Sequence, residues 1–180
     1  ANDADACVEL GADMIGFNFC RKSPRYIEPA MVRRIIDALP PRTCGVGVFV
    51  DADPAEIRKL AKTAGLRCVQ LHGHTAPESC SELAREFRVI RALSTDTQFE
   101  PEHAAVFPDC DLLIDAYHPE LRGGTGQTCD WSAARAAMRY TRFLILSGGL
   151  DAQNVGRAIA AVTHPPVGGC CGDGRPPGGD

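Results

Sequence analysis

Polar residues end several short apolar runs in this sequence, and they are the residues whose types and spacing suggest chemistry. Asp115 directly follows three aliphatic residues. A carboxyl group in that place can take part in catalysis, cap the following loop or bind a neighbouring cation, and the residue alone leaves these roles open. Gln70 and His72 are two positions apart in another apolar run, so they share one face of a strand. His72 could line a substrate cleft or hold a loop carbonyl, and both roles stay open.

A second candidate is an anion site at Ser147, Gly148 and Gly149. Glycines let backbone N–H groups approach an anion closely, and the helix expected after them adds the positive end of its dipole. The same pattern also suits a turn in which Asp151 caps the helix, and one segment can do both. The sequence therefore predicts a phosphate-binding turn here.

The elements that must position these residues alternate between strands and helices. One segment shows clear helix signals, with Asp53 as a cap, Pro54 in the first turn and Gly65 after the end. Asp51 and Asp130 are interpreted as caps of turns or helices. Strands are expected at residues 13–19, 45–50, 68–73, 89–94, 110–115 and 142–149. Helices are expected at residues 30–39, 51–66, 76–87, 131–140 and 152–162.

This alternation predicts an α/β fold in which helices cover a parallel sheet. The strands are continuous apolar runs, which is typical of strands buried on both faces. An open doubly wound sheet and a closed (β/α)8 barrel both fit, and in both the functional residues gather at the carboxyl ends of the strands. Arg25, in a loop stiffened by Pro24, belongs to the same set. No G-x-G-x-x-G follows a strand, which argues against a dinucleotide site.

Composition narrows the classes of protein. A chain of 180 residues, 44% hydrophobic and 23% charged, is expected to form one soluble globular domain. The net charge of −4 gives no basic footprint for nucleic acid, and no apolar run approaches the roughly 18 residues of a membrane span. The acidic first residues lack the basic region of a signal peptide, so a cytoplasmic location is expected. The nine cysteines are scattered without C-x-x-C, so they are expected to be small apolar residues, and no metal site is predicted.

Several motifs together resemble one enzyme family, the phosphoribosylanthranilate isomerases. The similarity runs from about Asp3 to about Val162, and the order of SPRY, QLHG and GGTG-x-T-x-DW is specific as a set. The resemblance implies a (β/α)8 TIM barrel and the isomerase of tryptophan biosynthesis. The matching segments are GFNFCRKSPRYI, VGVFVD, VQLHG, LLIDAYHPELRGGTGQTCDWS and LILSGGLDAQNV.

The resemblance also implies a reaction, the Amadori rearrangement of N-(5-phosphoribosyl)anthranilate to 1-(2-carboxyphenylamino)-1-deoxyribulose 5-phosphate. Asp115 matches the family's general acid, and partial burial helps a carboxyl group keep its proton. Arg25 is implied to bind the anthranilate carboxylate, since a guanidinium can donate two parallel hydrogen bonds. Gln70 and His72 are expected to bind substrate. The expected partner is this small molecule, with no cofactor, metal, nucleic acid or membrane, and the oligomeric state stays open.

Both ends of the chain depart from the family pattern. The family's first strand carries K-I-C-G, whose cysteine is the general base, and this motif is absent from the 180 residues. Cys7 lies instead in the helix that follows that strand. The last residues are rich in Gly, Pro and Cys, so we expect a barrel over residues 1–166 and a disordered tail over residues 167–180. The chain is therefore expected to be a fragment without isomerase activity of its own.

Two rival functions stay open. Another sugar-phosphate isomerase or epimerase barrel would share the phosphate turn but lack the SPRY and GGTG-x-T-x-DW context. A non-catalytic barrel would bind phosphate and carboxylate groups, the latter through Arg25, without turnover. Turnover of phosphoribosylanthranilate, compared with mere binding of a product analogue, separates these possibilities.

Overall fold

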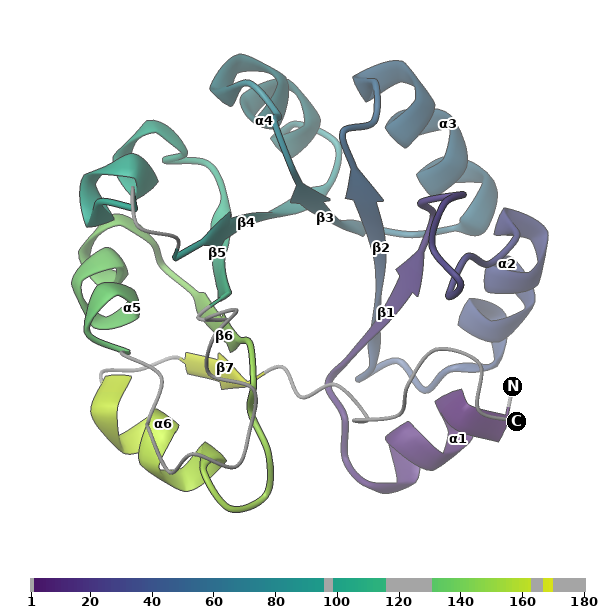
Figure 1. Ribbon diagram of the computed structural model, residues 1–180. Helices are drawn as coiled ribbons and strands as arrows, with labels where there is room; N and C mark the ends of the chain where they lie inside the picture. Colours follow the sequence, from purple (N-terminus) through teal and green to yellow (C-terminus); the bar gives the residue numbers. More distant parts are fainter. Residues whose placement is uncertain (1, 96–98, 116–130, 163–166, 170–180) are drawn as a thin grey trace. The chain divides into compact units, whose positions relative to one another are not determined.

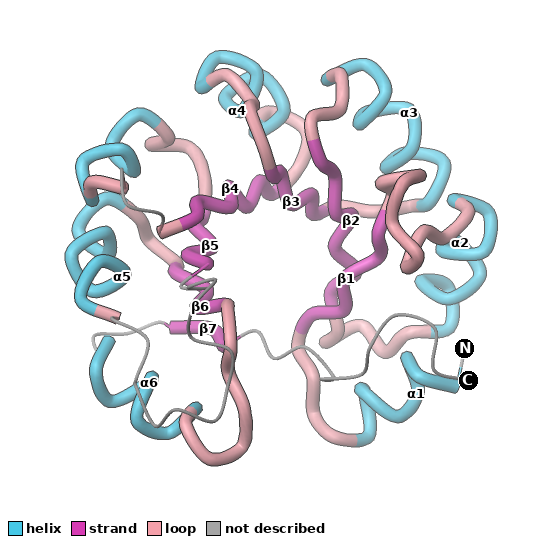
Figure 2. The backbone as a smooth tube through the Cα atoms, viewed as in Figure 1, coloured by secondary structure: helices cyan, strands magenta, loops and turns pink. Residues whose placement is uncertain are grey.

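The structure, a computed structural model, describes residues 2–95, 99–115, 131–162 and 167–169. These residues form two compact units, one up to Ile90 and one from Arg91 onward. Strand β4 (Arg88–Ser94) begins in the first unit and ends in the second. Within each unit, strands and helices alternate along the chain (Figures 1 and 2).

The first unit contains three parallel strands that pair in sequence order, β1 with β2 and β2 with β3. In register, Met14 is the partner of Cys44, and Val46 is the partner of Cys68. The parallel pairing confirms for this unit the sheet that the sequence predicts. The elements are α1 (Asn2–Glu9), β1 (Met14–Asn18), α2 (Pro29–Ala38), β2 (Cys44–Val50), α3 (Pro54–Ala64), β3 (Cys68–His72) and α4 (Pro77–Ala84).

Helix α3 begins and ends where its local sequence signals predict. The side chain of Asp53 accepts a hydrogen bond from the N–H of Ala55 at 2.7 Å, and Pro54 is the first helical residue. Gly65 follows the helix with a φ of 72°, a left-handed conformation that glycine adopts without a steric cost. The buried residues of the helix are Ile57, Ala61 and Ala64.

Glycine at position 45 allows α2 to pack closely on β2. A Cβ atom on Gly45 would collide with Cδ1 of Ile36 in α2. The same atom would lie 3.0 Å from Cδ2 of Leu66 and 3.3 Å from Cε2 of Phe17. Because protein interiors are close-packed, an added methyl group here forces its neighbours to move. The absence of a side chain is therefore a packing requirement of this strand.

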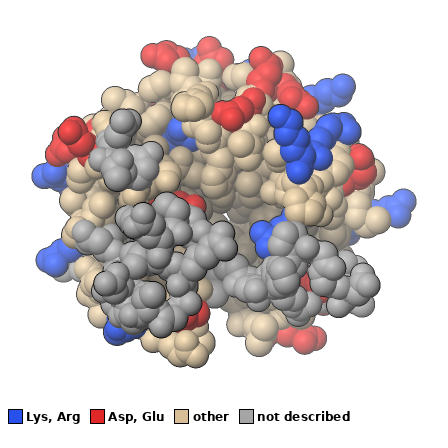
Figure 3. All heavy atoms as spheres, viewed as in Figure 1, with Lys and Arg blue, Asp and Glu red and all other residues tan. Residues whose placement is uncertain are grey.

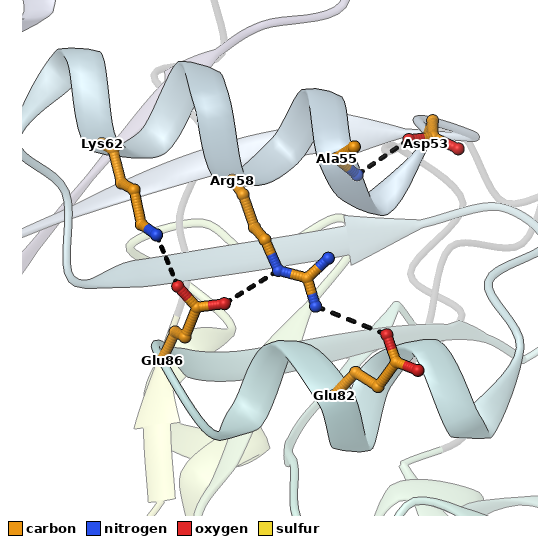
Figure 4. A network of polar contacts seen from close by, with 6 residues as sticks. All are labelled: Asp53, Ala55, Arg58, Lys62, Glu82 and Glu86. Carbon is orange, nitrogen blue, oxygen red and sulfur yellow. Dashed lines mark hydrogen bonds and ion pairs between the residues drawn. The ribbon is translucent and has the colours of Figure 1, made fainter.

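Ion pairs join α3 to α4 and the residues that follow it (Figure 4). Arg58 Nε lies 2.8 Å from Oε1 of Glu86, and Arg58 also contacts Glu82 at 3.4 Å. Lys62 Nζ lies 2.6 Å from the other oxygen of Glu86. Hydrogen bonds from Lys62 and then Arg58 hold the pKa of Glu86 below its ordinary value. Because these groups remain accessible to solvent, each pair contributes only modestly to stability.

The second unit contains another set of parallel strands, in which β5 pairs with β6 and β6 pairs with β7. Leu112, Leu113 and Ile114 are consecutive in β5 and all buried, so both faces of this strand are covered. This burial explains the continuous apolar run in the sequence. The elements are η1 (Pro101–Val106), β5 (Asp111–Asp115), α5 (Ser132–Ala137), η2 (Met138–Tyr140), β6 (Leu144–Ser147), α6 (Val155–Val162) and β7 (Val167–Gly169).

Strand β7 corrects one expectation. The sequence predicts a disordered tail from residue 167, whereas Val167–Gly169 pairs with β6, where Leu144 is the partner of Val167. Backbone N–H and C=O groups can join a ladder without apolar side chains, so a search for apolar runs misses such a strand. Residues 170–180 lie outside the described residues, and the boundary between barrel and tail stays a prediction. The 3-10 helix η1 is a second element that the sequence does not predict.

Charged side chains of both signs are interspersed on the face that Figure 3 shows, which agrees with the small net charge of −4. Among the described residues, no helix combines the length and the apolar character needed to cross a membrane.

Candidate active site

Asp115 and Ser147 end neighbouring strands of the second unit. Asp115 is the last residue of β5, Ser147 is the last residue of β6, and the two are partners in the parallel register. Both residues are half-buried. The buried residues that precede Asp115 fix the strand, so its carboxyl group has a defined place at the carboxyl edge of the sheet, as predicted.

Thr95, which directly follows β4, holds the backbone at Asp115. The N–H of Thr95 donates to the carbonyl oxygen of Asp115 at 3.0 Å, and the Thr95 hydroxyl donates to the same oxygen at 3.2 Å. These two bonds restrain the strand end that carries the carboxyl group. Thr95 is not among the residues predicted from the sequence, although a polar residue after a predicted strand was the available signal.

The turn after β6 combines glycine conformations with a helix cap. Gly148 and Gly149 have φ values of 92° and 62°, which side-chain-bearing residues rarely adopt. Asp151 accepts hydrogen bonds from the N–H groups of Gln153 and Asn154, both at 2.8 Å, and the Asn154 amide donates to the carbonyl of Gly149 at 2.8 Å. The cap that the sequence suggests is therefore present. A phosphate site at the glycines is compatible with it and stays a prediction.

Arg25 lies in the loop between β1 and α2 of the first unit, and it is exposed. Its backbone N–H donates to the hydroxyl of Ser23 at 3.1 Å. Asn18, the last residue of β1, ties both parts of the loop to the strand. Its side-chain oxygen accepts from the N–H of Cys20 at 2.8 Å, and its carbonyl accepts from the N–H of Ile27 at 3.0 Å. Asn18 is a second residue that the sequence-based prediction does not include.

Strand β3 carries Gln70 and His72 on one face, as their spacing predicts, and their Nε2 atoms are 2.6 Å apart. Which of the two nitrogens donates depends on the tautomer of His72. The contact couples the orientations of the two side chains at the carboxyl end of β3.

Asp51 directly follows β2, and its carboxylate bonds to the turn after β3. Oδ1 of Asp51 accepts from the N–H of His74 at 2.6 Å. The cap of the next helix, α3, is Asp53 instead. Asp51 therefore caps a turn, as expected, but the turn belongs to the neighbouring strand. Asp130 lies outside the described residues.

The cysteines that the structure describes differ in burial. Cys68, Cys80 and Cys110 are buried, as expected for small apolar residues. Cys44 is half-buried at the start of β2, and a hydrogen bond with the thiol of Cys68 lowers the pKa of Cys44 to about 6, against the opposing effect of burial. Cys7 is exposed and lies on α1.

Two groups of predicted site residues are thus formed, one in each unit. In the second unit, Asp115 and Ser147 lie at adjacent strand ends with the glycine turn directly after them. In the first unit, Gln70 and His72 contact each other, and Arg25 lies in the loop after β1. The GGTG-x-T-x-D part of the resemblance lies outside the described residues.

Parallel strands that alternate with helices and carry polar residues at their carboxyl ends define the (β/α)-barrel class of enzymes. A family model described as N-(5'phosphoribosyl)anthranilate (PRA) isomerase matches residues 1–170 of the chain. The chain belongs to this family. Its solved structures are (β/α)8 barrels, so the barrel implied by the resemblance is confirmed over the open sheet.

Relatives and solved structures agree with this assignment. The N-(5'-phosphoribosyl)anthranilate isomerase of Geobacter sp. (strain M21) is 45% identical over 163 residues, which cover 89% of this chain and 77% of the relative. The Thermotoga maritima relative of the same name is 42% identical over 160 residues, covering 89% and 78%. The crystal structure of phosphoribosyl anthranilate isomerase from Thermotoga maritima matches with a TM-score of 0.82 and 40% identity, covering 93% of this chain and 82% of that one. A crystal structure of the isomerase in complex with reduced 1-(o-carboxyphenylamino)-1-deoxyribulose 5-phosphate matches with a TM-score of 0.80 and 37% identity, covering 94% and 80%.

Proposed function

We propose that this chain supplies the general acid and the substrate-binding residues for the isomerisation of N-(5'-phosphoribosyl)anthranilate to 1-(2-carboxyphenylamino)-1-deoxyribulose 5-phosphate in tryptophan biosynthesis. One observation carries the proposal: the register pairs Asp115 with Ser147, so a carboxyl group lies beside the start of the glycine turn. In this proposal the phosphate binds at Gly148 and Gly149, directly after Ser147, and the ribose lies toward the carboxyl group of Asp115. The relative solved with the reduced product supports the class of substrate.

Asp115 is the proposed general acid. Its carboxyl proton goes to the ring oxygen of the ribose, the bond between C1′ and that oxygen breaks, and the lone pair of the anthranilate nitrogen forms a C1′=N iminium. Proton transfer from a positioned group lowers the barrier because the leaving oxygen never carries a full negative charge. The restraint by Thr95 serves this step, because it holds the strand end that carries the acid.

A general base completes the rearrangement. It removes the proton from C2′, the electron pair of that C–H bond forms the C1′=C2′ double bond, and the iminium nitrogen becomes neutral. The resulting enolamine tautomerises to the ketone at C2′. The proposal assigns this base to the cysteine of a K-I-C-G strand, as the resemblance implies, and that motif is not found within the 180 residues.

The other site residues bind substrate in this proposal. Arg25 pairs with the anthranilate carboxylate through two parallel hydrogen bonds. Gln70 and His72 are further substrate-binding residues. The N–H groups at Gly148 and Gly149 hold the phosphate with help from the helix that follows. A cytoplasmic location is part of the proposal, because a phosphorylated substrate does not cross a membrane unaided.

Two proteins test the proposal: the 180-residue chain, and a chain in which a K-I-C-G-I-T strand precedes residue 1 and a full-length last strand with a following helix replaces the residues from 167 onward. Loss of phosphoribosylanthranilate fluorescence measures turnover. We expect turnover in the second protein and poor turnover when serine replaces its added cysteine, with folding kept. No turnover in the second protein contradicts the function. An enzyme-like rate in the unmodified chain contradicts the assignment of the base.

A non-catalytic function, in which the chain binds phosphate and carboxylate groups, is the second candidate. Such a protein binds the reduced product through Arg25 and the glycine turn without converting substrate. Binding in both proteins with turnover in neither supports this alternative. Turnover of other phosphorylated sugars, but not of phosphoribosylanthranilate, supports another sugar-phosphate isomerase.

A further inference from the structure

Asp51 has an unusual backbone conformation at the carboxyl end of β2. Its φ is 48°, and among the described residues it is the one non-glycine residue with a positive φ. Residues with a Cβ atom adopt this left-handed region at a cost in free energy, although aspartate and asparagine tolerate it better than most. Such a conformation persists when surrounding contacts stabilise it. The contacts of Asp51 therefore indicate which part of the structure depends on this backbone conformation.

The contacts of Asp51 hold the chain at His72 and at His74, the residues on either side of Gly73. The backbone N–H of Asp51 donates to the carbonyl of His72 at 3.2 Å, continuing the pairing of Val50 with His72. The carboxylate of Asp51 then accepts from the N–H of His74 at 2.6 Å. One residue thus holds the backbone at His72 and at the second residue after it.

Gly73, between these two points, leaves room for the carboxylate. Its φ is 78°, and a Cβ atom there would collide with Oδ1 of Asp51 and lie 2.6 Å from its Cγ atom. The left-handed residue at the end of β2 and the left-handed glycine after β3 therefore fit against each other. The sequence motif QLHGH and the aspartate after VGVFV form one structural feature, although 23 positions separate Asp51 from His74.

We propose that Asp51 is a positioning residue for substrate binding: by holding the backbone at His72 and at His74, it sets the direction in which the Gln70–His72 pair presents its polar atoms. This inference rests on the proposed function for the identity of the ligand. The hydrogen bond to the His74 N–H carries the effect, and the negative charge is not required. An amide oxygen at position 51 serves as well as a carboxylate.

Substitutions at Asp51 separate the hydrogen bond from the charge and from backbone strain. Asp51→Asn keeps an acceptor and tolerates the left-handed φ. Asp51→Ala loses the acceptor and keeps the strain, whereas Asp51→Gly loses the acceptor and removes the strain. Asp53→Ala is the matched control, because it removes the cap of α3 on the same loop without touching the turn at His72.

Two measurements test the proposal on the folded chain. Isothermal titration calorimetry gives the dissociation constant for reduced 1-(o-carboxyphenylamino)-1-deoxyribulose 5-phosphate. Nitrogen NMR of the imidazole, assigned by the loss of its signals in His72→Gln, gives the tautomer and environment of His72. We expect Asp51→Ala and Asp51→Gly to weaken binding about tenfold, the upper end of what an uncharged hydrogen bond is worth, and to shift the His72 signals. Asp51→Asn and Asp53→Ala should retain wild-type affinity and wild-type His72 signals.

The other possible results also decide whether Asp51 positions the Gln70–His72 pair. Wild-type affinity and His72 signals in Asp51→Gly overturn the proposal, as does an Asp51→Asn protein that loses as much affinity as Asp51→Ala. Equal losses in Asp53→Ala show a general loss of stability and also overturn it. If Asp51→Ala does not fold, Asp51→Gly carries the same comparison. If the wild-type chain does not bind the probe, the proposed function fails, and the His72 signals alone then test the role of Asp51.

Discussion

Replacing Gly45 with alanine should destabilise the protein through overpacking between α2 and β2. The new Cβ atom would collide with Ile36 and approach Leu66 within 3.0 Å. Overpacking of this kind typically costs about 1–3 kcal/mol. Alanine also restricts the unfolded chain, which offsets about 0.4–1 kcal/mol. We therefore expect a net loss of about 1–2 kcal/mol in the free energy of unfolding.

Gly16→Ala on the neighbouring strand is the matched control. A Cβ atom there would lie 3.5 Å from Cγ2 of Val48, an ordinary van der Waals contact. Both glycines pair within the sheet of β1 and β2, so the effect on the unfolded chain is the same for both. The difference between the two variants therefore isolates the overpacking, at about 1–3 kcal/mol.

Urea unfolding followed by far-ultraviolet circular dichroism measures both variants. Ile36→Val removes the colliding methyl group, so it should cost about 0.5–1.5 kcal/mol alone and less, or nothing, in combination with Gly45→Ala. Equal stability of Gly45→Ala and Gly16→Ala would refute the reasoning. A simple sum of the two effects in the double variant would refute the assignment of the collision to Ile36.

Three further outcomes follow from single side chains. Arg25→Lys should weaken binding of carboxylate ligands, because lysine keeps the charge and loses the planar fork, whereas equal losses for a carboxamide analogue would contradict the carboxylate role. The Cys68 thiol stabilises Cys44 as a thiolate, so the rate of Cys44 alkylation should increase with pH around a pKa of about 6. Peptide mass spectrometry measures this rate. An increase only near the ordinary thiol pKa of about 8.5 would contradict the prediction. In Glu86→Gln, the free energy of unfolding should decrease less steeply as the pH is lowered than in the wild type. Lys62 lowers the pKa of the folded carboxylate, so this stabilisation is present above the unfolded pKa of about 4.3 and is lost as pH falls through the folded value; an unchanged pH slope in urea unfolding would contradict it.

The order of strands and helices could be predicted because each element has local signals. The cap at Asp53, the proline after it and Gly65 set the ends of α3 without help from the rest of the chain. Apolar runs predicted β1 to β6 because both faces of such strands are buried, as at Leu112, Leu113 and Ile114. Strand β7 lacks such a run, and pairing with β6 rather than its own composition defines it.

The candidate site could be predicted only in part, because its contacts join distant segments. Asp115 was predicted from its place at the end of an apolar run. Thr95 was not predicted: its position after a strand was a signal, but its bonds to Asp115 depend on the end of β4 lying beside the end of β5. Asp51 was recognised as a cap, but its partner His74 follows from the register of β2 with β3. The spacing of residues along the chain does not reveal which strand ends lie side by side.

Turnover by Asp115→Asn tests the central claim, that Asp115 supplies the proton which opens the ribose ring. The substitution is made in the protein that carries the K-I-C-G strand, with Asp111→Asn at the other end of β5 as the matched control. Because asparagine cannot donate that proton, kcat should fall on the order of 10²-fold or more while KM changes little. The Asp111→Asn control should keep most of its activity. Near-normal kcat in Asp115→Asn would remove this residue from the mechanism.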